Sequence, residues 1–174
     1  YKKDGLARHI VYRTGNEGAD LFRHACQSCH TVAGYKALRP AFDGMDREFL
    51  AAMVKGTHLM RGNMPPFLGT ATEADKIAGY LHEQIDRRPL EEICRERGLD
   101  FGRQAYTQRC GKCHVVGTAT DKSKSFVGLS ADELSGLLDV SESLGVGMPA
   151  YTGPAAERAA LIRYLETLGK QVKK

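Results

Sequence analysis

The residues with the clearest chemistry in this sequence are two cysteine pairs, each followed directly by a histidine. They are Cys26-Gln27-Ser28-Cys29-His30 and Cys110-Gly111-Lys112-Cys113-His114. Cys-x-x-Cys-His is the attachment pattern of c-type haem. The two thiols add to the haem vinyl groups as thioethers, and the histidine ligates the iron from one face. The sequence therefore predicts two covalent haem c groups, held by Cys26, Cys29, Cys110 and Cys113, with His30 and His114 as iron ligands.

Each motif is followed, at the same distance, by a methionine that precedes a proline. Met64-Pro65 follows His30 at the spacing by which Met148-Pro149 follows His114. A residue before proline is biased towards extended backbone, which favours a loop over a helix. A thioether ligand favours ferrous iron and raises the reduction potential. We therefore predict Met64 and Met148 as the second axial ligands of the two irons.

The two motifs belong to a longer duplication. The shift that carries Cys26 onto Cys110 also aligns residues 18–85 with 102–169, without a gap. Matching positions include Gly18 with Gly102, Phe22 with Tyr106, Leu50 with Leu134, Glu73 with Glu157, and Tyr80-Leu81 with Tyr164-Leu165. Because the matches fall on haem-site and packing positions, we predict two tandem domains. Their expected bounds are 1–86 and 98–174, with a charged helical linker at 87–97.

The pattern of apolar residues predicts an all-α fold. Apolar residues recur at helical spacing in 48–54, 77–85, 132–138 and 161–168, and no alternating strand pattern competes with them. Asp46, Thr72 and Ser130 are the expected N-caps. Domains of this size usually need stabilisation beyond their hydrophobic core, and a covalently bound haem can provide it.

The composition limits the classes of partner. Lys and Arg exceed Asp and Glu by 25 to 21 in 174 residues, without a long run of like charges, so nucleic acid is not an expected partner. No stretch approaches the roughly 20 apolar residues that span a bilayer. The chain begins at Tyr1, so we expect a processed or trimmed form, and a membrane anchor could have been lost with the missing part.

The order of these motifs resembles the class I cytochrome c domain. Gly-x-x-x-Phe-x-x-x-Cys-x-x-Cys-His from Gly18 to His30, the later Met-Pro, and a final helix with Tyr80-Leu81 carry the resemblance, and the second half repeats it from Gly102 to Leu165. The resemblance implies that the first helix of each domain crosses the last at its glycine. It also implies an exported, periplasmic protein, because haem attachment takes place on the outer side of the energy-transducing membrane.

The whole chain is similar to two-domain dihaem cytochromes c of bacterial respiratory chains. This similarity implies a single-electron carrier and not an enzyme, with a dehydrogenase or quinol-oxidising complex as donor and an oxidase or reductase as acceptor. Two alternatives stay open. One is the electron-accepting subunit of a flavocytochrome c type dehydrogenase, with residues 1–17 contributing a docking face. The other is a dihaem oxidoreductase in which one iron has a labile ligand.

The second half departs from the family pattern near the proximal histidine. In this family, the carbonyl of a proline shortly after the haem motif commonly holds the ring of the iron-binding histidine. Pro40 is a candidate for this role in the first half. Its counterpart in the second half is Lys124, and no proline lies between His114 and Met148. We therefore expect another carbonyl to orient His114, and the two haems to differ in potential.

Other residues offer alternative ligands. Zinc or thiol redox sites are a second interpretation of the cysteine pairs, but the adjacent histidines and the absence of a βαβ pattern oppose it. His58 and Met60 lie near Met64 but align with Glu142 and Leu144. Cys94 is expected as a small buried residue beside Leu90 and Ile93, with iron ligation or an intermolecular disulfide as alternatives.

Overall fold

A computed structural model describes residues 4–60, 64–145 and 147–172, and all the regular structure in these ranges is helical. Within the same ranges, one isolated bridge joins Thr31 and Ala37. The chain divides into two compact units, residues 1–87 and 88–174. None of the described helices has both the length and the apolar composition that a membrane crossing needs.

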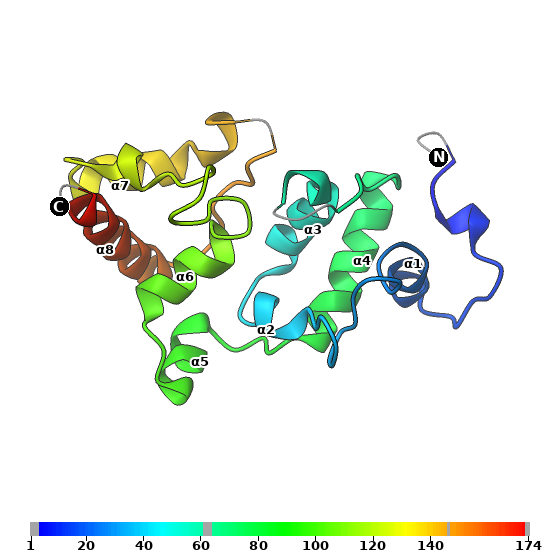
Figure 1. Ribbon diagram of the computed structural model, residues 1–174. Coiled ribbons are helices and arrows are strands. Elements are labelled where there is room, and N and C mark those ends of the chain that lie inside the picture. The colour runs from blue at the N-terminus through cyan, green and yellow to red at the C-terminus, as the bar shows by residue number, and fades with distance from the viewer. Residues whose placement is uncertain (1–3, 61–63, 146, 173–174) are drawn as a thin grey trace. The chain divides into compact units, whose positions relative to one another are not determined.

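The first unit contains four α-helices and two short 3-10 helices in its described part. They are η1 (Ala7–His9), α1 (Glu17–Ala25), α2 (Arg39–Phe42), α3 (Arg47–Lys55), η2 (Thr57–Leu59) and α4 (Ala71–Gln84). Helices α1 and α3 both pack against α4 (Figure 1).

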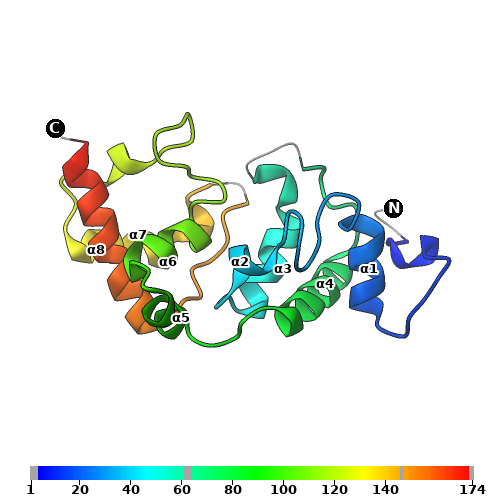
Figure 2. The ribbon, with the colours of Figure 1, turned by 60° about the horizontal axis from the view of Figure 1, so that its bottom comes forward.

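The second unit has a similar set of elements, preceded by one further helix. They are α5 (Leu90–Arg97), α6 (Phe101–Arg109), η3 (Ser123–Phe126), α7 (Ala131–Asp139), η4 (Ser141–Ser143) and α8 (Ala155–Gln171). Helices α6 and α7 both pack against α8 (Figure 2). Helix α5 covers most of the segment predicted as a linker, and it packs against α6 and α8 through its buried Leu90, Ile93 and Cys94.

The element bounds of the second unit repeat those of the first at the offset that relates the two cysteine motifs. Helix α1 begins at Glu17 and α6 at Phe101, and the same offset separates α3 from α7, η2 from η4, and the start of α4 from that of α8. The buried cores follow this register as well. Leu50, Ile77 and Leu81 in the first unit correspond to Leu134, Leu161 and Leu165 in the second, and all six are buried.

Side-chain caps fix most of the helix starts. Asp46 accepts from the Phe49 amide, and Ser130 accepts from the Glu133 amide, as the sequence predicts for these two residues. The prediction of Thr72 is wrong by two residues, because α4 begins earlier in the chain. Thr70 and Glu73 form a reciprocal capping box there, which satisfies two backbone amides and places Thr72 inside the helix.

A glycine allows each first helix to cross the last helix of its unit. A Cβ atom added to Gly102 would lie 2.5 Å from the Ala160 carbonyl oxygen, and one added to Gly18 would collide with the Lys76 carbonyl oxygen. One turn further on, the ring centroids of Phe22 and Tyr80 are 5.6 Å apart. Both contacts with α4 lie in α1 before the first cysteine motif, which begins at the end of this helix.

Candidate haem sites

Both cysteine motifs form the same backbone turn at the end of a helix. In the first unit, the Cys29 and His30 amides donate to the Cys26 carbonyl over 3.1 and 2.9 Å. In the second unit, the Cys113 and His114 amides donate to the Cys110 carbonyl over 3.1 and 2.8 Å. The turn presents two thiols and an imidazole from five consecutive residues in each unit.

The four motif cysteines are free thiols. Burial raises the pKa of Cys26 to about 11 and that of Cys110 to about 12. Thiol redox motifs depend on a lowered pKa, so these values oppose a role as redox thiols. Across the described ranges, no group of three or more His, Cys, Asp and Glu side chains is arranged to hold a metal ion. Free thiols beside a histidine fit covalent attachment of haem.

The two histidines predicted to bind iron have different surroundings. The Nδ1 atom of His114 lies 3.3 Å from the Thr120 carbonyl oxygen. The Nδ1 atom of His30 is buried and has no hydrogen-bond partner among the described residues. Pro40, the sequence candidate for this role, is exposed in the first turn of α2 and does not provide one.

Hydrogen bonds within the loop after His114 hold the Thr120 carbonyl in place. The Val115 amide donates to Thr120 Oγ1 over 3.2 Å, and the Gly117 amide donates to Asp121 Oδ2 over 2.7 Å. The Gly117 hydrogen bond is the main cause that lowers the pKa of Asp121. The Tyr106 hydroxyl donates to the His114 carbonyl over 2.8 Å, a bond that Phe22 cannot make in the first unit.

The two predicted methionine ligands are half-buried and lie in loop segments without regular structure. Each is in the same compact unit as its predicted histidine partner. The Thr57 hydroxyl donates to the Pro65 carbonyl over 2.8 Å, and the Ser141 hydroxyl donates to the Pro149 carbonyl over 3.2 Å. A hydroxyl therefore fixes the backbone next to each methionine.

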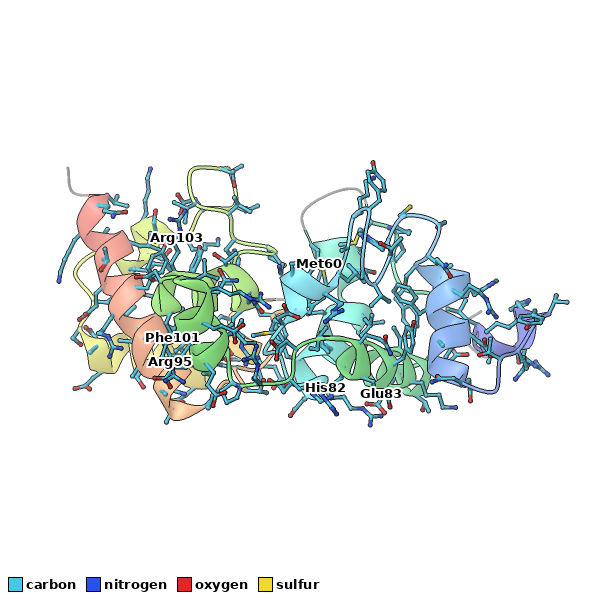
Figure 3. The ribbon with its side chains drawn as sticks, turned by 90° about the horizontal axis from the view of Figure 1, so that it is seen from below. Met60, His82, Glu83, Arg95, Phe101 and Arg103 are labelled. Carbon is cyan, nitrogen blue, oxygen red and sulfur yellow. The ribbon has the colours of Figure 1, made fainter. Side chains whose placement is uncertain are left out.

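The alternative ligands occupy less suitable positions. His58 is exposed in η2, and Met60 follows that helix directly (Figure 3). Cys94 is 1% exposed on α5, where burial raises its pKa, so it packs as a small buried side chain. His9 and His24 are exposed, and His82 is half-buried on α4.

The sequence does not predict a buried ion pair that lies next to the second motif. Arg109 Nε lies 2.7 Å from Glu157 Oε1, with side chains 3% and 1% exposed. The Tyr151 hydroxyl donates to the same carboxylate over 3.2 Å, and Arg109 donates to Thr152 Oγ1 over 3.2 Å. The signal in the sequence was the repeated glutamate, Glu73 and Glu157. The repeat does not indicate that Arg109 is the partner of Glu157, because Arg109 aligns with Ala25 in the first half.

In the first unit, the N-terminal segment donates a hydrogen bond to the corresponding glutamate, Glu73. Glu73 accepts hydrogen bonds from the Ala7 amide over 2.7 Å and from the Thr70 amide over 2.8 Å. Pro154, at the position equivalent to Thr70, has no amide hydrogen to donate. The two carboxylates are therefore stabilised differently, Glu157 by a guanidinium and Glu73 by backbone amides.

Residues 13–81 match the family model described as cytochrome c oxidase, cbb3-type, subunit III. This match, which covers less than half of the chain, supports a cytochrome c domain and with it covalent haem and electron transfer. No curated protein and no solved structure matches the chain.

Proposed function

We propose that this protein is a dihaem c-type cytochrome that carries single electrons between respiratory redox partners. The observation that carries the proposal is the repeat in the second unit, which has its own Cys-x-x-Cys-His turn, helix crossing and Met-Pro loop at a constant offset from those of the first. The family match covers the first unit alone. The proposal extends the cytochrome c assignment to residues 98–174.

Each residue of the site has a defined role in this proposal. Cys26, Cys29, Cys110 and Cys113 bind the two haems covalently. His30 and Met64 are the axial ligands in the first unit, and His114 and Met148 are those in the second. Bound haem supplies an iron that alternates between the ferric and ferrous states. A histidine and a methionine at each iron leave no position for a substrate, which favours electron transfer over catalysis.

The partners follow from this chemistry. A thioether raises the reduction potential, which suits a carrier that delivers electrons to an oxidase or reductase. The name of the matched family supports an oxidase as acceptor, and the donor is a dehydrogenase or a quinol-oxidising complex. We place the protein in the periplasm, because c-type haem is attached on that side of the membrane.

A second candidate is the cytochrome subunit of a dehydrogenase complex. Val11 is 100% exposed and Tyr12 is 71% exposed in the N-terminal segment, and these side chains provide apolar surface for a permanent partner. Isolation of the native protein at moderate salt separates the two candidates, because a permanent subunit would copurify with a flavoprotein.

A redox titration followed by ligand-sensitive spectroscopy tests the ligand assignment. Met64→Ala and Met148→Ala should each remove one thioether signal from the ferric spectrum and lower the potential of one haem. Met60→Ala is the matched control and should leave both signals unchanged. An unchanged spectrum in either ligand variant would refute that assignment. A high-spin or thiolate-ligated haem in the wild type would instead favour a dihaem oxidoreductase.

A further inference from the structure

The first residue of each 3-10 helix near the methionine loops carries a hydroxyl that binds the loop backbone. Thr57 begins η2 and Ser141 begins η4, and each is bonded to the carbonyl of the proline eight residues later. That proline directly follows the predicted methionine ligand. The contact is therefore made one residue away from the thioether.

The sequence between the hydroxyl and the methionine otherwise differs in the two units. Residues 58–63 and 142–147 share no identical position when the two halves are aligned, whereas Met-Pro and the hydroxyl are present in both. Two different residue types, threonine and serine, make the same hydrogen bond. A contact that persists while its surroundings change indicates a role for the hydroxyl itself.

This hydrogen bond ties the ligand loop to the helical frame. Thr57 follows the C-cap of α3, Gly56, and α3 packs against α4. Proline fixes its own φ angle, so a bond at its carbonyl restrains the residue before it as well. A restrained loop keeps the thioether in position when it dissociates briefly, and this favours its return over binding of another ligand.

The bond in the second unit is the better protected of the two. Ser141 is 6% exposed, and its hydroxyl oxygen also accepts a hydrogen bond from the Tyr151 amide over 3.1 Å. Thr57 is half-buried, and its bond to Pro65 is exposed to water. Hydrogen bonds shielded from water are electrostatically stronger, so Ser141 should hold its loop more firmly.

We propose that Thr57 and Ser141 are positioning residues that hold Met64 and Met148 on the iron. The proposal rests on the proposed His/Met ligation. Neither hydroxyl needs to touch the haem, because each acts through the backbone of the ligand loop. The role adds one positioning residue to each of the two sites, next to the predicted ligands.

Imidazole titration of the ferric holoprotein tests this role, because imidazole binds only when the methionine has left the iron. Loss of the thioether-to-iron absorption band reports displacement at each haem. Ser141→Ala, which removes two hydrogen bonds, should raise the imidazole affinity of one haem by about tenfold, and Thr57→Val, which removes one, should raise that of the other by a few-fold. Ser141→Thr and Thr57→Ser should restore wild-type affinity.

Ser143→Ala is the matched control, since Ser143 donates to the Val140 carbonyl over 2.8 Å on the same turn as Ser141. It should bind imidazole like the wild type. Wild-type affinity in both hydroxyl variants, or an equal rise in the Ser143 control, would overturn the positioning role while leaving the ligation intact. A wild-type protein without the thioether band would overturn both proposals.

Discussion

The Nδ1 atom of His114 lies 3.3 Å from the Thr120 carbonyl oxygen, whereas the Nδ1 atom of His30 finds no partner among the described residues. When Nε2 of a histidine binds iron, Nδ1 carries the proton and donates it in such a contact. Donation raises the basicity of the ring, which strengthens the ligand and stabilises ferric iron. The two predicted iron-binding histidines therefore differ in their hydrogen bonds, although the cysteine motifs have the same turn.

We predict that the haem bound by Cys110 and Cys113 has the lower reduction potential. One hydrogen bond worth about 1 kcal/mol corresponds to roughly 40 mV for a one-electron couple. A redox titration of the wild type gives both potentials, and Met64→Ala identifies the haem of the first unit. Equal potentials, or a lower value for the first unit, would contradict this prediction.

The loop that carries the Thr120 carbonyl offers a direct test of the same contact. Thr120→Val removes the hydroxyl that accepts from the Val115 amide, so the carbonyl should be less well fixed. We expect the potential of the second haem to rise and that of the first to stay constant. Thr107→Val, which removes a hydroxyl from the exposed side of α6, is the control and should change neither.

The helices can be predicted from the sequence because their signals are local and periodic. The apolar spacing around Leu50 and Leu134 predicted α3 and α7, and Asp46 and Ser130 cap these helices as expected. The start of α4 was missed by two residues, because a capping box at Thr70 competes with a simple cap at Thr72. The glycine crossings follow from the family pattern at Gly18 and Gly102.

The polar contacts around the sites were not predictable in the same way. The Ala7 amide and the Glu73 carboxylate are 66 positions apart, and neither residue type signals the other. Arg109 pairs with Glu157, which is 48 positions away in the sequence. The position equivalent to Arg109 in the first unit is an alanine, Ala25. The carbonyl that faces His114 depends on the hydrogen bonds of a loop without periodicity. Such contacts require the three-dimensional structure.

The helix crossing in the second unit should not tolerate a side chain at Gly102. Its added Cβ would approach the Ala160 carbonyl oxygen and lie 3.0 Å from Tyr164 Cβ. Gly102→Ala should therefore lower the free energy of unfolding by about 1–3 kcal/mol, the range for overpacked sites. Gly136→Ala on α7 meets no atom within 4 Å and should stabilise by about 0.5–1 kcal/mol. Denaturant titration distinguishes the two, and similar effects would contradict the crossing.

The buried pair of Arg109 and Glu157 should be costly to break from one side. Glu157→Gln leaves the guanidinium of Arg109 buried without its counter-charge, and we expect a loss of about 3–5 kcal/mol in unfolding free energy. Replacing both residues, with Arg109→Met and Glu157→Leu, should cost less than the single change. A double variant at least as unstable as Glu157→Gln would show that the pair itself supplies the stability.

The stability of the first unit should fall in acid because of Glu73. Burial opposes ionisation of this carboxyl, but hydrogen bonds from the Thr70 and Ala7 backbone amides hold its pKa below the ordinary value. A lowered pKa gives a contribution that is complete above pH ~4.3 and is lost as the pH falls through the folded-state value.

Glu73→Gln should flatten this acid-side loss, measured as unfolding free energy against pH. Glu83→Gln, on the exposed surface near the other end of α4 (Figure 3), is the control and should keep the wild-type slope. An unchanged slope in Glu73→Gln would show that other carboxyl groups cause the acid sensitivity.

We propose that both halves of the chain bind haem covalently. Mass spectrometry of the intact holoprotein under denaturing conditions tests it directly, because only thioether-bound haem stays with the unfolded chain. We predict a mass increase of two haem groups, which falls to one when Cys110 and Cys113 are both replaced by alanine. A wild-type increase of one haem or none would contradict covalent attachment in both halves.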